Sequence, residues 1–136
     1  MDTFALIDNQ VITADGPSGT QVPIPTATMM DVTLEVEGAV SGTSPTLHVW
    51  LQTAADQEEW FAEPVPAALK SDAAGANVSA VVDKRNINGD TAMSAQGEKH
   101  KAKYPHIAAG WVRANWKIGG TATPTFNNVK CKASVK

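Results

Sequence analysis

Hydrophobic and polar residues alternate along several stretches of the chain, and this pattern predicts strands. In residues 30–36 every second residue is apolar, and the residues between them are Asp, Thr and Glu. The same period of two recurs in residues 47–52, 111–118 and 128–135. Successive side chains of a strand point to opposite faces of a sheet, so each stretch offers one face to a core and one to water. We therefore expect an all-β protein built from antiparallel strands.

A turn phrase rich in glycine, threonine and proline occurs twice. Residues 42–47 read Gly-Thr-Ser-Pro-Thr-Leu, and residues 120–126 read Gly-Thr-Ala-Thr-Pro-Thr-Phe. Glycine permits the positive φ of a tight reversal, and proline fixes its own φ without needing a ladder partner. Because each phrase follows a strand-like run, we predict two wide strand reversals of the same kind. About eight strands with hardly any helix favour an antiparallel β-sandwich of jelly-roll type.

The domain organisation expected from 136 residues is a single domain with an extended N-terminal arm. Residues 1–27 hold two short strand-like runs, followed by loops rich in glycine and proline. We assign residues 1–27 to the arm and its loop, and residues 28–136 to the β-sandwich. The first residues carry no positively charged segment before an apolar one, and no run approaches the ~20 apolar residues of a membrane span. We expect neither a secretory signal nor a membrane partner, and expect the protein to be made in a cytoplasm.

Acidic and basic residues are distributed unevenly. All 14 acidic residues lie in residues 1–98, whereas residues 99–136 hold eight Lys or Arg and no acid. If late strands pair with early ones, this asymmetry neutralises itself across strands, for instance Lys130 and Lys132 against Glu35 and Glu37. The alternative is a dipolar surface suited to docking on a charged lattice.

Residue patterns typical of catalysis, metal binding or cofactor binding are missing. The three histidines have no Cys or carboxylate at a metal-ligand spacing. No serine lies in a Gly-x-Ser-x-Gly turn, and the adjacent Glu58 and Glu59 point apart on a turn. We expect a protein that is not an enzyme, with no catalytic residue, metal or cofactor. The one cysteine, Cys131, is expected to be a buried and inert thiol.

Two groups of residues are candidates for contacting another molecule. Lys99, Lys101 and Lys103 lie in a short basic segment, which is either a solvated loop or a contact to an acidic protein surface. A nucleic-acid partner is disfavoured because the chain is acidic overall, with a pI near 5.5.

The second group is aromatic. Trp50 and Trp111 alternate onto the face opposite the small aliphatic residues. Three roles are open to each of them: packing on a second layer of the sandwich, anchoring a protein interface near Arg113, or stacking on a sugar ring. Trp60 and Trp116 are expected in the core.

The order of these motifs resembles a known class of phage proteins. Residues 9–13 read Asn-Gln-Val-Ile-Thr, and a Gly-Pro-Ser-Gly loop follows at 16–19. Residues 36–47 read Val-x-Gly-x-Val-Ser-Gly-Thr-Ser-Pro-Thr-Leu. An acidic hairpin ending in Trp60, the sequence Trp-Val-Arg-Ala at 111–114 and the second turn phrase follow. This arrangement resembles the small jelly-roll proteins of tailed bacteriophages that decorate or cement the capsid. Related β-sandwiches of phage tails and head fibres, and carbohydrate-binding modules, are the alternatives.

The resemblance implies a structural virion protein on the capsid exterior, assembled in the host cytoplasm. Its partners would be the major capsid protein and further copies of itself, as a homodimer or homotrimer. The N-terminal arm around Phe4, Leu6 and Ile7 is then the first candidate for reaching a neighbour, because exposed strand edges accept added strands.

Overall fold

The computed structural model describes residues 2–17, 19–24, 29–62, 86–89, 91–104 and 110–135. Every regular element in this part of the chain is a strand. The strands are β1 (Asp2–Ile12), β2 (Val22–Ile24), β3 (Met30–Val36), β4 (Val40–Ala54), β5 (Phe61–Ala62), β6 (Lys99–Tyr104) and β7 (Gly110–Val135). All pairings between them are antiparallel, which confirms the predicted all-β class.

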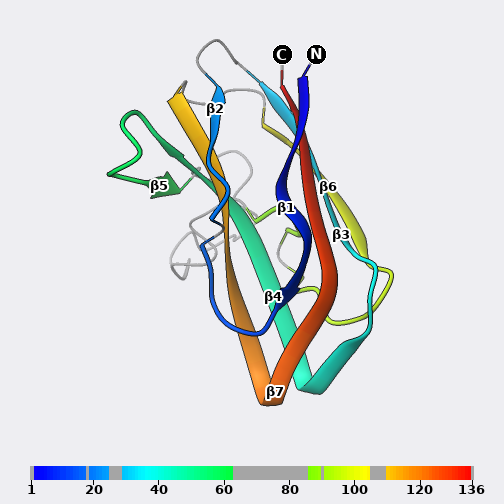
Figure 1. Cartoon of the computed structure of the whole chain (residues 1–136). Helices are drawn as coiled ribbons and strands as arrows, with labels where there is room; N and C mark the ends of the chain where they lie inside the picture. The colour runs from blue at the N-terminus through cyan, green and yellow to red at the C-terminus, as the bar shows by residue number, and fades with distance from the viewer. Residues whose placement is uncertain are drawn as a thin grey trace, which may run out of the picture.

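The strands form one sheet that curls into a half-barrel (Figure 1). β7 bends near its middle and contributes to two halves of this sheet. Its first part lies between β4 and β2, with β5 beyond β4, and we call these strands the β4 half. Its last part lies between β3 and β1, with β6 beyond β3, and we call these strands the β3 half.

The two turn phrases lie opposite each other, at the corner where β4 and β7 bend together. Thr43 is in register with Thr121, and the register is irregular on both sides of this pair. The φ angles of Gly42 and Gly120 are 105° and 115°, values that only glycine adopts readily. Figure 1 shows both strands reversing direction at this corner. Each predicted reversal is present, but the two form one shared corner.

Alternate residues of both halves meet in a single apolar core. Its buried residues from β3 and β4 include Val32, Leu34, Val36, Leu47, Val49 and Leu51. Trp116 is 4% exposed, as predicted, and its Nε1 donates a hydrogen bond to the Ala14 carbonyl at 2.9 Å. Cys131 is fully buried, and burial raises the pKa of its thiol to about 12. A thiol that stays protonated is a poor nucleophile, which agrees with the predicted inert role.

The N-terminal residues form an edge strand, which corrects the prediction of an extended arm. β1 pairs with β7 along its length. Leu6 and Ile7 are 0% and 1% exposed, so they belong to the core of this chain and are not available to a neighbour. A register shift between Ala5 and Ile7 breaks the regular alternation, which allows two consecutive residues to be buried. Phe4 is partly buried against the same core.

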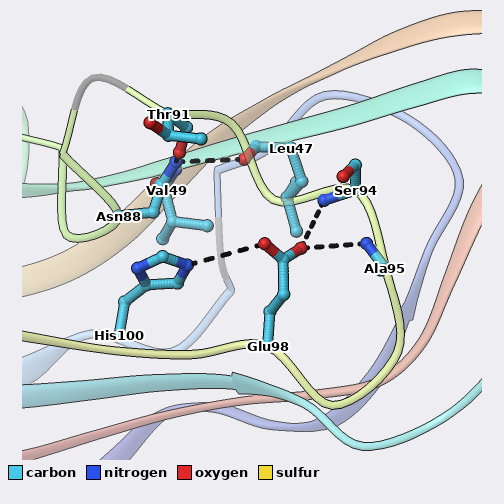
Figure 2. A network of polar contacts seen from close by, with 8 residues as sticks. All are labelled: Leu47, Val49, Asn88, Thr91, Ser94, Ala95, Glu98 and His100. Carbon is cyan, nitrogen blue, oxygen red and sulfur yellow. Dashed lines mark hydrogen bonds and ion pairs between the residues drawn. The ribbon is translucent and has the colours of Figure 1, made fainter.

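The segment before β6 covers the outer edge of β4. Asn88, which is 4% exposed, accepts a hydrogen bond from the Val49 N–H at 3.1 Å through Oδ1. Its Nδ2 donates to the carbonyls of Leu47 and Thr91 at 3.3 and 2.8 Å (Figure 2). The amide of this one side chain therefore makes contacts that a neighbouring strand would otherwise provide.

Glu98 holds the other end of the same segment against β3. Its Oε2 accepts hydrogen bonds from the N–H groups of Ser94 and Ala95 at 2.5 and 2.9 Å. The Glu98 carbonyl accepts from the Val36 N–H at 3.1 Å. His100 Nε2 lies 4.0 Å from Glu98 Oε1 (Figure 2). The network of Figure 2 thus joins the two halves of the sheet, and we assign it a structural role.

Candidate functional site

The outer face of the β4 half carries the polar and aromatic side chains that alternate with core residues. Trp50 is in register with Asn115, and Gln52 is in register with Arg113. In β7 the residues between them, such as Val112 and Ala114, are fully buried in the core. Period-two alternation therefore sets these polar residues side by side on one surface.

Arg113 is held in a fixed orientation on this face. Its guanidinium carbon lies 4.1 Å from the centroid of the Trp60 ring, a cation–π contact. Its Nε donates a hydrogen bond to Gln52 Oε1 at 2.8 Å, and Asn115 Nδ2 donates to the same oxygen at 3.3 Å. The stacking and the hydrogen bond together fix both the plane and one edge of the guanidinium.

The charge of Arg113 has no carboxylate partner among the described residues. The ion pairs in this part of the chain involve the lysines of β6 and β7 and His100, and none involves Arg113. Partial burial lowers the pKa of Arg113, although a guanidinium still remains charged at neutral pH. Arg113 is therefore a positive group that is partly removed from water and not neutralised within the described structure.

The loop between β4 and β5 supplies the ring under Arg113. Asp56 Oδ1 accepts hydrogen bonds from the N–H groups of Glu58 and Glu59 at 2.9 and 3.1 Å, and these bonds lower the Asp56 pKa. Trp60 Nε1 donates to the Gln57 carbonyl at 3.1 Å. These contacts place Trp60 on the outer face at partial exposure, which corrects its predicted place in the core.

The two tryptophans singled out from the sequence have different environments. Trp50 is 5% exposed, which agrees with packing and not with an exposed stacking surface. Trp111 is partly exposed and is in register with Pro23 of β2 and Ala54 of β4. A sugar platform needs both rings exposed, so the pair Trp50 and Trp111 does not form one.

The lysines singled out from the sequence lie on the outer face of the β3 half. Lys99 Nζ is 3.9 Å from Glu35, and Lys103 Nζ is 3.8 Å from Asp31. Lys101 is in register with Thr33, between these two pairs. The basic segment is therefore strand β6 rather than a loop, and two of its three lysines meet acids of β3.

Charges on the other side of β3 are paired as well. Lys130 Nζ lies 2.8 Å from Glu37 Oε2, and this hydrogen bond is the main cause of the lowered pKa of Glu37. The predicted neutralisation across strands is thus confirmed for this pair. A groove of about 370 Å³ lies on this face. It is lined by charged residues, Asp31, Glu35, Glu37, Lys99, Lys130 and Lys132, together with Thr3, Thr33 and Ser134.

The described residues contain no cluster of three or more His, Cys, Asp or Glu that could hold a metal ion. Within the same ranges there is also no helix long and apolar enough to cross a membrane. His48 is half-buried on the β4 half, where burial and nearby Lys117 lower its pKa. Among the described residues, His48 forms no hydrogen bond with a nucleophilic side chain.

Comparison of the chain with protein-family models, with curated proteins and with solved structures finds no match. The geometry therefore carries the functional argument. Sequence reasoning singled out Arg113 and Trp111 but missed Trp60 and Gln52, which fix the arginine. The signal for Trp60 was its position directly after the hairpin that follows β4, because that hairpin brings the chain back alongside β4.

Proposed function

We propose that this chain is a structural protein that binds another protein through the outer face of its β4 half. The observation that carries the proposal is Arg113, which is stacked on Trp60, fixed by Gln52 and without a carboxylate among the described residues. Arginine and tryptophan are the residues most enriched at the energetic centres of protein interfaces. A cation that is already ordered loses little side-chain entropy when a partner binds.

The motif resemblance supplies the identity of the partner in this proposal. The chain would decorate the outer surface of a tailed-phage capsid between major capsid subunits, as a homodimer or homotrimer, and it would have no catalytic role. The proposal includes the assignment of the curled sheet to the jelly-roll type of β-sandwich. What supports that assignment is the single core shared by the two halves.

Stabilisation of the shell would follow from mass action. A protein that binds the mature lattice and not its disassembled subunits stabilises the lattice by about 2.7 kcal/mol per site at a free concentration 100 times Kd. The effect is repeated at every site, so a modest affinity protects a whole shell.

Co-sedimentation with the mature heads of the phage that encodes the chain tests this function. The wild-type chain is expected to pellet with heads in a saturable manner, and to raise the temperature at which the heads lose their DNA. Sedimentation with isolated tails instead of heads would favour the tail-component alternative. Because β1 is part of the sheet, single substitutions are better probes of binding than a truncation that removes this strand.

A further inference from the structure

Among the described residues, one edge of the Arg113 guanidinium is occupied and its other edge has no hydrogen-bond partner. Its Nε–H group is used by Gln52, and no hydrogen bond of the two terminal amino groups is present among the described residues. An arginine offers five N–H donors in a rigid plane, and its terminal edge matches the two oxygens of a carboxylate. Stacking on Trp60 fixes the plane in which such a carboxylate would be bound.

Charge complementarity indicates which group occupies that edge. The strand residues on the outer face of the β4 half include Lys117 and Arg113 and, among the described ones, no Asp or Glu. The β3 half differs, because its acids and lysines alternate across strands and form three ion pairs of 2.8 to 3.9 Å. A carboxylate delivered by a partner would therefore find in Arg113 an ordered guanidinium with no carboxylate partner among the described residues, whereas three lysines of the β3 half already face acids.

The surroundings of Arg113 add an apolar contact. Trp111 precedes Arg113 by two residues in β7, so both side chains lie on the same face. Trp111 is partly exposed and in register with Pro23. A partner side chain that reaches Arg113 would place its aliphatic or backbone atoms beside the indole of Trp111 and the ring of Pro23.

We propose that Arg113, Trp60 and Gln52 form a receptor for a single Asp or Glu side chain of the partner protein, with Trp111 packing beside it. Gln52 and Trp60 are positioning residues, and Arg113 makes the contact. The inference rests on the proposed function in that the partner is a protein. It goes further in naming the group that is recognised and the atoms that recognise it.

The first experiment uses mature phage heads and the substitution Arg113→Lys. Lysine keeps the positive charge but loses the planar pair of donors and the stacking. We expect affinity for heads to fall at least about tenfold, because one partner of a desolvated charge pair loses its geometry. Lys132→Met, which removes one charge from the β3 half, is the matched control and is expected to bind within about twofold of wild type. Binding by Arg113→Lys that equals wild type would overturn the proposal.

The second experiment does not depend on heads, so it separates this inference from the proposed function. N-acetyl-glutamate amide and its neutral analogue N-acetyl-glutamine amide are titrated into the isotope-labelled full chain. The Nε–H resonance of Arg113 and the indole N–H of Trp60 are followed by NMR. Glutamate amide is expected to produce a saturable shift of both signals, whereas glutamine amide produces at most a small one.

The outcomes of the two experiments are distinct. A glutamate-specific shift in a chain that does not sediment with heads would retain the carboxylate receptor and remove the phage-head function. Sedimentation with heads that is insensitive to Arg113→Lys, or equal shifts with both probes, would remove the receptor. The Trp60→Phe variant keeps a ring under the guanidinium and is expected to retain most of the shift of the Arg113 Nε–H signal, which distinguishes stacking from the indole hydrogen bond.

Discussion

The two halves of the sheet share β7 and one core, yet their outer faces differ in how charge is balanced. On the β3 half, the acidic strand β3 lies between lysines of β6 and β7, and the charges meet in pairs such as Lys130 with Glu37. On the β4 half, Arg113 has an aromatic ring and an amide as partners, and no carboxylate among the described residues.

Under the proposed function, this difference means that exposed charge alone does not identify the binding surface. The lysines of β6 are the most conspicuous basic residues of the sequence, but a solvated pair such as Lys103 with Asp31 is neutralised and contributes little. Arg113 is a single residue in the sequence, and its significance depends on what surrounds it. A face that balances its own charges has less to gain from a partner than a face that does not.

The largest effect is expected from breaking the corner that separates the two halves. A Cβ at Gly120 would lie 2.9 Å from the carbonyl oxygens of Thr43 and Ser44, at a φ of 115°. We expect Gly120→Ala to lower the free energy of unfolding by about 3 kcal/mol or more, from backbone strain and crowding together. Urea unfolding measures this loss. Gly19→Ala is the control, since a Cβ there meets nothing within 4 Å and stability should change by less than about 0.5 kcal/mol.

A smaller effect, confined to the β4 half, is expected at Asn88. Asn88→Ala removes the acceptor of the buried Val49 N–H. An unsatisfied buried donor costs about 2 kcal/mol. Amide hydrogen exchange should accelerate more at Val49 than at the residues of β3. Thr91→Ala keeps the backbone carbonyl that Asn88 contacts and should leave stability nearly unchanged; an equal loss in both variants would contradict the role assigned to the Asn88 side chain.

Mild acid should act on the β4 half through His48. Burial and Lys117 lower the pKa of His48 below its ordinary value of 6.5, so the unfolded chain takes up the proton first. The free energy of unfolding is therefore expected to fall as pH decreases below 6.5, until the folded protein is protonated as well. Urea unfolding at several pH values checks this, and His48→Gln should remove this part of the dependence. A wild-type curve identical to that of His48→Gln would show that His48 does not contribute.

The smallest expected effect is on the β3 half and occurs in stronger acid. The hydrogen bond from Lys130 lowers the pKa of Glu37 below its ordinary value of 4.5. The unfolded chain binds this proton first, so stability is lost as pH falls below 4.5 through the lowered pKa. Lys130→Met should make this decline shallower. Because Glu37 is exposed, the difference is expected to be modest and to shrink at high salt.

The strands were predictable from the sequence because alternation is a local signal. Residues 30–36 and 111–118 repeat with period two, and both are strands with the expected faces buried. β1 was harder to predict because Leu6 and Ile7 are adjacent, and only the irregular pairing with β7 buries both. Local alternation cannot reveal such a register shift.

Contacts between distant segments were not predictable in the same way. The corner joins Thr43 with Thr121, and nothing in either turn phrase specifies that the other faces it. The position of Trp60 depends on a loop in which Gln57 has a φ of 63°. Arg113 could be singled out from its position in a strand. The ring on which it stacks depends on this loop, and its amide partner depends on the register between β4 and β7.

A direct comparison of the two faces tests the central proposal, that the β4 half is the contact surface. The measurement is the affinity of the wild-type chain, Arg113→Lys and Lys101→Met for mature heads of the phage that is proposed to encode the chain, determined side by side by co-sedimentation. We predict that Lys101→Met binds as wild type does and that Arg113→Lys binds at least about tenfold more weakly. Full binding by Arg113→Lys together with loss of binding by Lys101→Met would contradict the account and place the contact on the β3 half.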